Sequence, residues 1–307
     1  MPFERSLIVL KNYLGDTVMA SPLVRAVQAQ SSATDILGPP ISEQILRFPD
    51  RKSRFYDPGN LAKVSQLLRT AKLVKQGEYD IAFVVNRSFR SALVVRLAGI
   101  PMRIGHSTEG RGFLLSHRVP YHKDRNEALS YLDLLRATGQ KVPGEFDGKP
   151  TLWVSDDERS QGAVLLNGAT IGIQPGARHD YKQIPIGIWQ AIGKELLGRG
   201  HRVAFFGGAE ERGILGELQF QGEDLVGRTS LRETIGALSN LSLMIGGDTG
   251  VMHLAAAVGT PTITAFGPTP AKKWGWYSEP HTVIQARNKD LKNLEYQEFE
   301  TAISRVL

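Results

Sequence analysis

The chain contains 307 residues, of which 41% are hydrophobic and 22% charged, and it contains no cysteine. This length suffices for two domains of ordinary size, the composition is that of a soluble globular protein, and the lack of cysteine excludes disulfides and thiolate metal sites. The net charge of +6 is uneven, because residues 1–150 carry 22 Lys and Arg against 14 Asp and Glu, whereas residues 151–307 carry 15 against 17.

The basic N-terminal half predicts an anionic partner for that half. Nucleic acid, an acidic glycolipid and an anionic membrane face all fit the charge alone. The basic residues are scattered and not interleaved with aromatic residues. This arrangement disfavours nucleic acid, because aromatic side chains are the usual stacking platforms for bases.

The N-terminal sequence Met-Pro-Phe-Glu-Arg (1–5) runs directly into a five-residue apolar segment. Such a segment is too short for the apolar region of a signal peptide. No apolar run in the sequence approaches the ~20 residues that a transmembrane helix needs. We therefore expect a cytoplasmic protein.

In the N-terminal half, strand-like and helical patterns alternate. Strands are predicted at 6–10, 54–56, 81–85, 103–105 and 118–121, and helices at 42–48, 60–75, 89–98 and 126–138. A further helix begins either at Asp16 or at Ser21, which is followed by a proline suited to the first helical turn. Asp16 follows the first strand, and it is either a ligand-facing carboxylate or a cap and turn residue.

The segment 141–150 contains two prolines and two glycines and is typical of an interdomain linker. After it, a capping box at 155–158 opens a helix. Strands are then predicted at 170–174, 201–206, 241–245 and 262–266, and helices at 189–197, 231–238 and 251–258. The remainder from His281 is polar and ends in a short helix at 296–306.

Such alternation predicts a mostly parallel sheet covered by helices on both faces. The distinctive residues of the second half fall where a strand ends and a helix begins, at Pro-Gly-Ala-Arg (175–178), Gly-Gly-Ala-Glu (207–210) and Asp-Thr-Gly (248–250). Glycine-rich turns, a helix N-terminus, Arg178 and Lys182 would together hold a diphosphate without a metal ion. The sequence has no P-loop, dinucleotide-binding, zinc-protease or serine-hydrolase motif.

A structural interpretation of the third turn is that Asp248 or Thr249 only caps the helix. Capping explains one such residue, but not the Asp-Thr-Gly run followed one turn later by His253. His253 either contacts the ligand or packs beneath the turn.

Several motifs along the chain point to one family. They are Leu-Gly-Asp (14–16) with Pro22, Gly-Ile-Pro-Met-Arg-Ile-Gly (99–105), Pro-Gly-Ala (175–177) with Lys182, and the run 246–268. With these motifs the chain resembles the lipopolysaccharide heptosyltransferases, glycosyltransferase family 9, over nearly its whole length to about Trp276. Asn-Arg-Ser-Phe-Arg-Ser-Ala (86–92) is similar to a segment of the type II branch, and Ile-Pro (184–185) stands where the family has Trp-Pro.

The resemblance implies an α/β fold with two Rossmann-like domains facing a central cleft, the GT-B type. Residues 1–150 would bind the acceptor and residues 151–307 the nucleotide sugar. The implied reaction is inverting, metal-independent transfer of heptose from ADP-heptose to an anionic glycolipid, the lipid A–core oligosaccharide. No cofactor and no nucleic acid are implied, and we expect a monomer that touches the cytoplasmic face of the inner membrane peripherally.

The resemblance also implies roles for individual residues. Asp16 looks like the general base, and Lys182 looks like the phosphate ligand. Asp248, Thr249 and Gly250 would contact the sugar and the diphosphate, and His253 either joins them or packs beneath the turn. Apart from the resemblance, the glycine-rich turns predict that Arg178 and Gly207 also contact the donor. Either Glu210 or Glu211 holds the ribose, or both are acidic only because they begin a helix. Two other functions suit the same scaffold: a nucleotide-sugar 2-epimerase and a non-catalytic nucleotide-sugar-binding protein.

Overall fold

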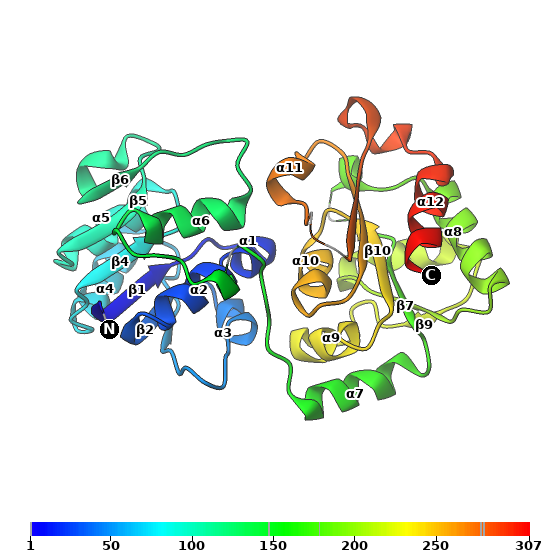
Figure 1. The fold of residues 1–307 in the computed structure, drawn as a ribbon, viewed down its shortest axis with the longest axis horizontal. Coiled ribbons are helices and arrows are strands. Elements are labelled where there is room, and N and C mark those ends of the chain that lie inside the picture. The colour runs from blue at the N-terminus through cyan, green and yellow to red at the C-terminus, as the bar shows by residue number, and fades with distance from the viewer. Residues whose placement is uncertain (1, 147, 178, 277, 279) are drawn as a thin grey trace. The chain divides into compact units, whose positions relative to one another are not determined.

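The computed structural model describes residues 2–146, 148–177, 179–276, 278 and 280–307. The chain divides into two compact units, Met1–Trp153 and Val154–Leu307 (Figure 1). Each unit is a six-stranded sheet with helices on its faces. Among the described residues, no helix combines the length and the hydropathy that a bilayer span requires.

The sheet of the first unit has the strand order β3-β2-β1-β4-β5-β6, and all its described pairings are parallel. Its strands are β1 (Phe3–Val9), β2 (Ser31–Leu37), β3 (Phe55–Tyr56), β4 (Ile81–Val84), β5 (Met102–His106) and β6 (His117–Val119). The central strand β4 is buried at every position, as a run of apolar residues in a parallel sheet should be.

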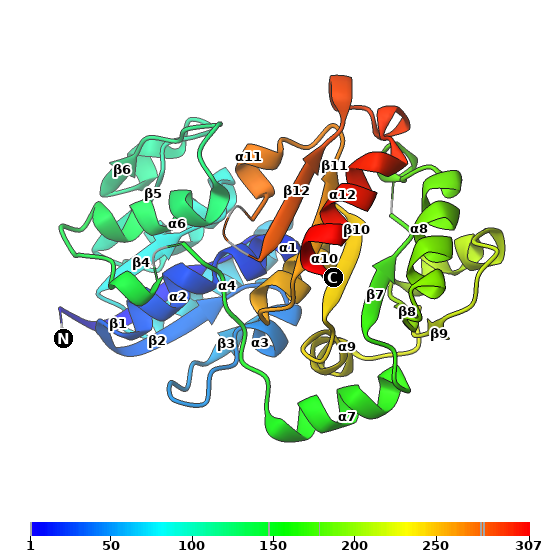
Figure 2. The same cartoon turned by 45° about the vertical axis from the view of Figure 1, so that its right-hand side comes forward.

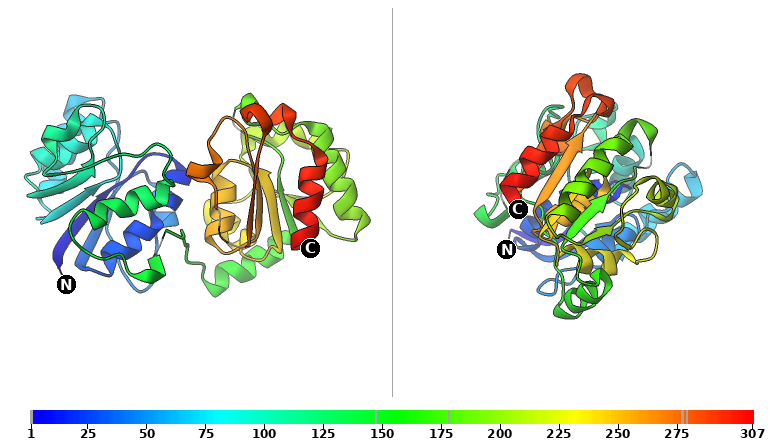
Figure 3. Two further views of the ribbon diagram at one scale, coloured as in Figure 1. Left: turned by 45° about the horizontal axis from the view of Figure 1, so that its top comes forward. Right: turned by 90° about the vertical axis from the view of Figure 1, so that its right-hand side faces the viewer.

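Two groups of helices cover this sheet on opposite faces (Figures 1 and 3). The helices of the first unit are α1 (Leu14–Met19), α2 (Ser21–Gln28), α3 (Ile41–Ile45), α4 (Val64–Lys75), α5 (Phe89–Leu97) and α6 (Glu127–Arg136), with short 3₁₀ segments η1 (Arg111–Leu114) and η2 (Gly144–Phe146). Helices α1, α2 and α6 pack together, and α4 packs against α5, which in turn meets η1. The buried residues under α4 and α5 form one hydrophobic core.

The second unit repeats this arrangement with the strand order β12-β11-β10-β7-β8-β9, again with parallel pairings. Its strands are β7 (Ile171–Gln174), β8 (Val203–Phe205), β9 (Glu223–Asp224), β10 (Leu243–Gly247), β11 (Thr262–Phe266) and β12 (His281–Gln285). In both units, the first strand therefore lies beside the fourth. This is the point where the strand order reverses and where open α/β sheets bind ligands at the carboxyl ends of their strands.

The helices of the second unit also form two groups. They are α7 (Asp156–Leu166), α8 (Ile186–Gly198), α9 (Leu231–Leu238), α10 (Gly250–Ala257), α11 (Ala271–Trp274) and α12 (Tyr296–Val306), with 3₁₀ segments η3 (Asp180–Lys182), η4 (Ala209–Glu217), η5 (Arg287–Lys289) and η6 (Leu291–Asn293). Helices α8 and α12 lie side by side over one face (Figure 2), where Trp189 meets Phe299 at 6.5 Å between ring centroids. Helices α7, α9 and α10 form the other group.

The parallel α/β architecture predicted from the sequence is confirmed, and so is the capping box at Ser155. A further capping box, at Ser230, opens α9. Both alternatives for the first helix occur, because α1 ends at Met19 and α2 begins anew at Ser21 with Pro22 in its first turn.

Three strands were not predicted. Strand β2 begins with the polar residues Ser31 and Ser32, so only its last part is apolar and the strand pattern in the sequence is weak. Strand β12 lies in the segment from His281 that was expected to be polar, and it is an edge strand with only partial burial. Strand β9 is also new, and it has only two residues.

Candidate functional site

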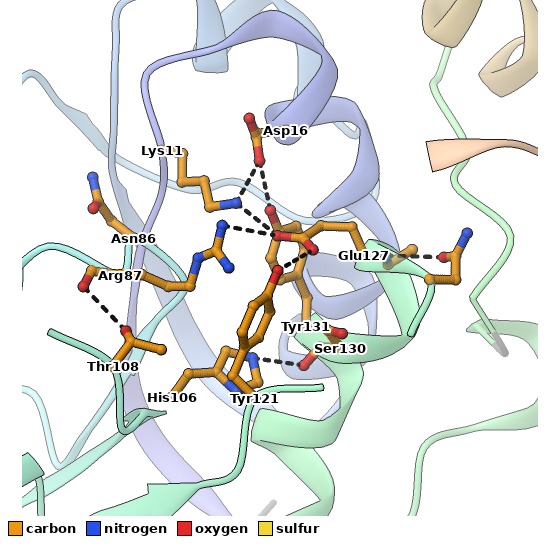
Figure 4. A network of polar contacts seen from close by, with 12 residues as sticks. Lys11, Asp16, Asn86, Arg87, His106, Thr108, Tyr121, Glu127, Ser130 and Tyr131 are labelled. Carbon is orange, nitrogen blue, oxygen red and sulfur yellow. Dashed lines mark hydrogen bonds and ion pairs between the residues drawn. The ribbon is translucent and has the colours of Figure 1, made fainter. Parts of the chain in front are cut away.

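Polar side chains of the first unit gather at the carboxyl ends of β1 and β4, around Asp16 (Figure 4). Asp16 is the third residue of α1 and is only 8% exposed. It is not the N-cap, because that position is Tyr13, whose side chain makes no capping bond. The interpretation of Asp16 as a mere helix cap is therefore wrong.

The ammonium of Lys11 lies between two carboxylates. Lys11 Nζ is 2.7 Å from Asp16 Oδ1 and 2.7 Å from Glu127 Oε1, so one cation bridges α1 and the start of α6 (Figure 4). The Glu127 side chain is fully buried. Buried charges are stable only when they are paired in this way.

Tyr131 adds a second donor to Asp16. Its hydroxyl donates to Asp16 Oδ1 at 2.8 Å. Burial raises the pKa of Tyr131 well above its usual value, and the neighbouring carboxylates of Asp16 and Glu127 raise it further, so the phenol stays protonated as a donor. Both donors reach Oδ1, and among the described residues no hydrogen bond reaches Oδ2.

Glu127 is also held from its other side. Tyr121 donates to Glu127 Oε2 at 3.2 Å, and Arg87 NH2 is 3.9 Å from Oε1. The Arg87 guanidinium lies 4.1 Å from the centroid of the Tyr121 ring, which is the geometry of a cation–π contact. The charges of Lys11 and Arg87 thus face those of Asp16 and Glu127 within one cluster.

A buried arginine fixes the turn that carries Arg87. Arg111 is fully buried and donates to the carbonyls of His106 (3.0 Å) and Asn86. Burial lowers the pKa of Arg111 to about 10, so the side chain remains charged at neutral pH. Its guanidinium donates hydrogen bonds to carbonyl oxygens at the ends of β4 and β5, and so it fixes the backbone at the edge of the site.

In the second unit, the corresponding site lies at the carboxyl ends of β7 and β10. Thr249 is the N-cap of α10, with extended φ and ψ of −138° and 168°, yet its side chain makes no capping bond. Its hydroxyl donates instead to the side chain of Gln174 at the end of β7. The first N–H groups of α10 therefore receive no hydrogen bond from the Thr249 side chain, and an anion can accept hydrogen bonds from such groups.

Asp248 pairs with the lysine identified from the sequence. Lys182 Nζ lies 2.8 Å from Asp248 Oδ2 and 3.3 Å from the Asp248 carbonyl oxygen. His253 Nε2 is 3.7 Å from Asp248 Oδ1. Burial works to raise the pKa of Asp248, but the His253 ring and the Lys182 ammonium outweigh it and hold that pKa below its usual range.

His253 lies beneath the turn and is buried, with 6% of its surface exposed. Trp276 Nε1 donates to His253 Nδ1 at 3.0 Å. Because an indole N–H can only donate, Nδ1 must be the unprotonated nitrogen, and Nε2 then carries the proton towards Asp248. The ring thus orients the Asp248 carboxylate from below.

The second unit also has a pocket of about 210 Å³, lined by residues of the β7–α8 loop, α8 and η4. Ile184 and Ile186 give it an apolar wall, and Glu210 and Glu211 line its other side. Glu211 Oε2 accepts from the Gly208 N–H at 3.0 Å and from Gln174 Nε2 at 3.4 Å. Burial raises the pKa of Glu211.

The structure thus brings together most of the residues expected to bind the donor. Asp248, Thr249, Gly250, His253 and Lys182 form one cluster, and Gly207 and Glu210 lie on the adjacent turn after β8, which Gln174 and Glu211 link to the cluster. Arg178 lies outside the described residues. Within the described ranges, no group of three or more His, Asp or Glu side chains is arranged to hold a metal ion.

The sequence did not identify Lys11, Glu127 or Tyr131 as site residues. Lys11 has a local signal, since it directly follows the first strand. Glu127 and Tyr131 lie more than 110 positions from their partners, and an acidic residue in a first helical turn is ordinarily explained by the helix dipole.

Comparison with known proteins gives a consistent result. Residues 67–303 match the model of the family described as glycosyltransferase family 9 (heptosyltransferase). The chain is 29% identical over 292 residues to lipopolysaccharide heptosyltransferase 2 of Escherichia coli K12, covering 86% of this chain and 82% of that protein.

Two solved structures are similar over almost their whole length. The E. coli ADP-heptose LPS heptosyltransferase II has a TM-score of 0.81 and 25% identity, with 98% of each chain covered. The glycosyl transferase family 9 protein of Veillonella parvula has a TM-score of 0.86 at 16% identity, covering 100% of this chain and 98% of that one.

Proposed function

Because this chain belongs to glycosyltransferase family 9, and is thus a glycosyltransferase of the GT-B fold, we propose that it moves a heptose from ADP-heptose to the core of a lipopolysaccharide. The E. coli relatives, lipopolysaccharide heptosyltransferase 2 and ADP-heptose LPS heptosyltransferase II, support this donor and this acceptor by their names. The single structural observation that carries the proposal is the Lys182–Asp248 pair at the uncapped N-terminus of α10. A cation and helix N–H groups without a side-chain cap at one point suit a diphosphate leaving group.

The second unit holds the donor in this proposal. The diphosphate lies at Thr249, Gly250 and the first N–H groups of α10, and Lys182 turns from Asp248 to the phosphate. The adenosine enters the pocket of Ile184 and Ile186, where Glu210 or Glu211 accepts hydrogen bonds from the ribose hydroxyls. Arg178 and Gly207 contact the phosphates, and Asp248 contacts the heptose.

The first unit holds the acceptor, and Asp16 is the general base. Its Oδ1 is fixed by Lys11 and Tyr131, which leaves Oδ2 to accept the proton of the acceptor hydroxyl. The hydroxyl oxygen bonds to the anomeric carbon from the face opposite the diphosphate, the bond from that carbon to phosphate oxygen breaks, and ADP leaves with inversion. Lys182 and the helix N–H groups stabilise the charge that develops on ADP.

We also propose that transfer needs no divalent metal, because Lys182 and the N-terminus of α10 already supply positive charge where the leaving group becomes negative. The acceptor is an anionic glycolipid, which suits a unit rich in Lys and Arg. It reaches the enzyme at the cytoplasmic face of the inner membrane.

The test is heptose transfer from ADP-heptose to a heptose-deficient core acceptor, measured in EDTA, by the wild type and by Asp16→Asn. The amide preserves the shape of the side chain, so melting temperature and ADP-heptose affinity should be retained. Transfer should fall about 10²–10⁴-fold, the usual contribution of a positioned base. Wild-type protein that hydrolyses or epimerises ADP-heptose without transferring it would refute the function. Near wild-type transfer by Asp16→Asn would refute the role of the base.

A further inference from the structure

One surface of the first unit is both basic and unusually apolar. Six of the eleven most exposed large apolar side chains among the described residues belong to α4, α5 and η1. They are Val64, Leu68, Leu73, Phe89, Leu97 and Phe113. Because α4 packs against α5 and α5 against η1, these side chains lie on one continuous layer, which we call the α4–α5 face.

Three of these apolar side chains are more than half exposed. Val64 is 72% exposed, Phe113 66% and Leu68 54%. Phe89 contacts Phe113 with 5.9 Å between ring centroids, so two phenyl rings form a protruding pair. Contiguous exposed apolar side chains of this kind mark a surface that meets another molecule or a membrane.

The charged residues of α4 and α5 all have the same sign. Six basic residues lie on or next to these two helices: Lys63, Arg69, Lys72, Lys75, Arg90 and Arg96. Neither helix nor η1 contains Asp or Glu. In the part of the chain that the structure describes, none of these six side chains forms an ion pair, so their charge is not neutralised within the protein.

We propose that the α4–α5 face binds the surface of an anionic lipid bilayer. Apolar side chains enter the boundary between head groups and acyl chains, and Lys and Arg contact lipid phosphates. Nucleic acid fits less well, because four of the six apolar side chains are aliphatic and cannot stack on bases. The inference rests in part on the proposed function, since that function places the acceptor in a bilayer.

The geometry of the unit explains why this face serves the reaction. Helices α4 and α5 both begin at the carboxyl edge of the sheet, because each follows the end of a parallel strand. Phe89 comes two residues after Arg87, which belongs to the Asp16 cluster. Binding through the start of α5 therefore holds the bilayer next to the edge at which the sugar of a lipid-anchored acceptor must arrive.

The experiment is co-sedimentation with vesicles of phosphatidylcholine alone or with phosphatidylglycerol, without nucleotide sugar or glycolipid. Wild-type protein should bind anionic vesicles at least tenfold more tightly than neutral ones, and added salt should weaken the binding. Lys72→Glu should weaken it about fivefold or more, and Leu68→Ser and Phe113→Ser about tenfold. Lys194→Glu and Val164→Ser, on exposed positions of α8 and α7, are the matched controls and should bind like wild type.

Equal binding to neutral and anionic vesicles, or equal effects of test and control variants, would overturn the inference. So would binding of DNA or RNA by a protein that ignores vesicles. Because these vesicles contain no substrate, the result is independent of transfer. Heptose transfer to a deacylated, water-soluble acceptor should be unchanged in Leu68→Ser. If wild-type protein failed to transfer heptose to this acceptor, the result would count against the proposed function and not against membrane binding.

Discussion

Lys11 is the residue on which the environment of the proposed base depends. It sits 2.7 Å from both Asp16 and Glu127, so its charge is divided between two carboxylates. Glu127 belongs to α6 and Asp16 to α1, so the shared ammonium fixes these two carboxylates relative to each other. Glu127 therefore acts as a positioning residue that holds Lys11 against Asp16 Oδ1.

We expect Glu127→Gln to lower the transfer rate. The amide keeps its shape and can still accept hydrogen bonds from Lys11 and Tyr121, but it no longer pairs its charge with the Lys11 ammonium, so Lys11 is held less firmly beside Asp16. The measurement is kcat and KM for transfer together with thermal melting, with Glu43→Gln on the exposed side of α3 as the control. Wild-type kinetics in Glu127→Gln would show that Glu127 does not position Lys11 for the reaction.

We expect Lys182→Ala to reduce transfer about a hundredfold, the typical cost of removing one preorganised charge contact to a leaving group. Folding should be affected far less, because Asp248 retains His253 and the Lys182 side chain is a quarter exposed. Steady-state kinetics and thermal melting of Lys182→Ala, beside Lys194→Ala on α8, separate the two effects. Wild-type kinetics in Lys182→Ala would remove this residue from the site.

Part of the site could be predicted from the sequence because its residues lie between a strand and the first turn of the next helix, and the family resemblance then implied their roles. Asp16, Lys182 and Asp248 each lie in such a segment, where parallel sheets present ligand-binding residues. Glu127 could not be predicted, because its partner Lys11 is 116 positions away and only the packing of α6 brings them together. Side-chain pairs between distant elements leave no periodic pattern in a single sequence.

At the scale of elements, α7 and α9 cross with their backbones in contact. A Cβ added at Gly162 would lie 2.2 Å from the backbone carbon of Gly236, and one added at Gly236 would lie 2.2 Å from the Glu158 carbonyl oxygen. Arg232 of α9 donates from Nε to Glu158 Oε1 at 2.8 Å. The two glycines therefore allow α7 and α9 to approach each other closely, and the ion pair between Arg232 and Glu158 stabilises this contact.

We expect Gly236→Ala to destabilise the protein by about 1–3 kcal/mol, the usual cost of overpacking. Intrinsic helix propensity alone favours alanine by about 1 kcal/mol, so the sign of the effect distinguishes contact from propensity. Gly187→Ala in α8 is the control, because a Cβ there meets no atom within 4 Å. Urea unfolding of both variants provides the measurement. If Gly236→Ala were as stable as Gly187→Ala, the two helices would not be in backbone contact.

At the scale of the whole molecule, both sheets have the same strand order with the first strand beside the fourth. The alternation of strands and helices predicts parallel sheets, because the periodicity changes from two to about 3.6 along the chain. It does not predict which strands are neighbours in the sheet, since the connection after a strand can lead to a position on either side of that strand. Strands β9 and β12 form the two edges of the second sheet, where partial burial weakens their apolar pattern.

Acid should destabilise the folded protein by protonating carboxylates whose pKa is lowered in the folded state. The hydrogen bond from Arg232 lowers the pKa of Glu158 to about 2, and the pKa of Asp248 is also below its usual range. A carboxyl group whose pKa is lower in the folded state adds stability above its unfolded pKa, about 4, and loses it as pH falls towards the folded value. Stability should therefore decline between about pH 4.5 and 2.

This decline can be assigned with one variant. Glu158→Gln should be less stable than wild type at pH 7, because Arg232 loses its charged partner. The difference in unfolding free energy should shrink as pH falls from about 4.5 to 2, where Glu158 of the wild type is itself protonated. Three of the four tryptophans, Trp189, Trp274 and Trp276, lie in the second unit, so urea unfolding followed by tryptophan fluorescence reports chiefly on the unit that contains Glu158. A difference that stayed constant from pH 7 to 2 would mean that packing, and not the charge of Glu158, holds α7 against α9.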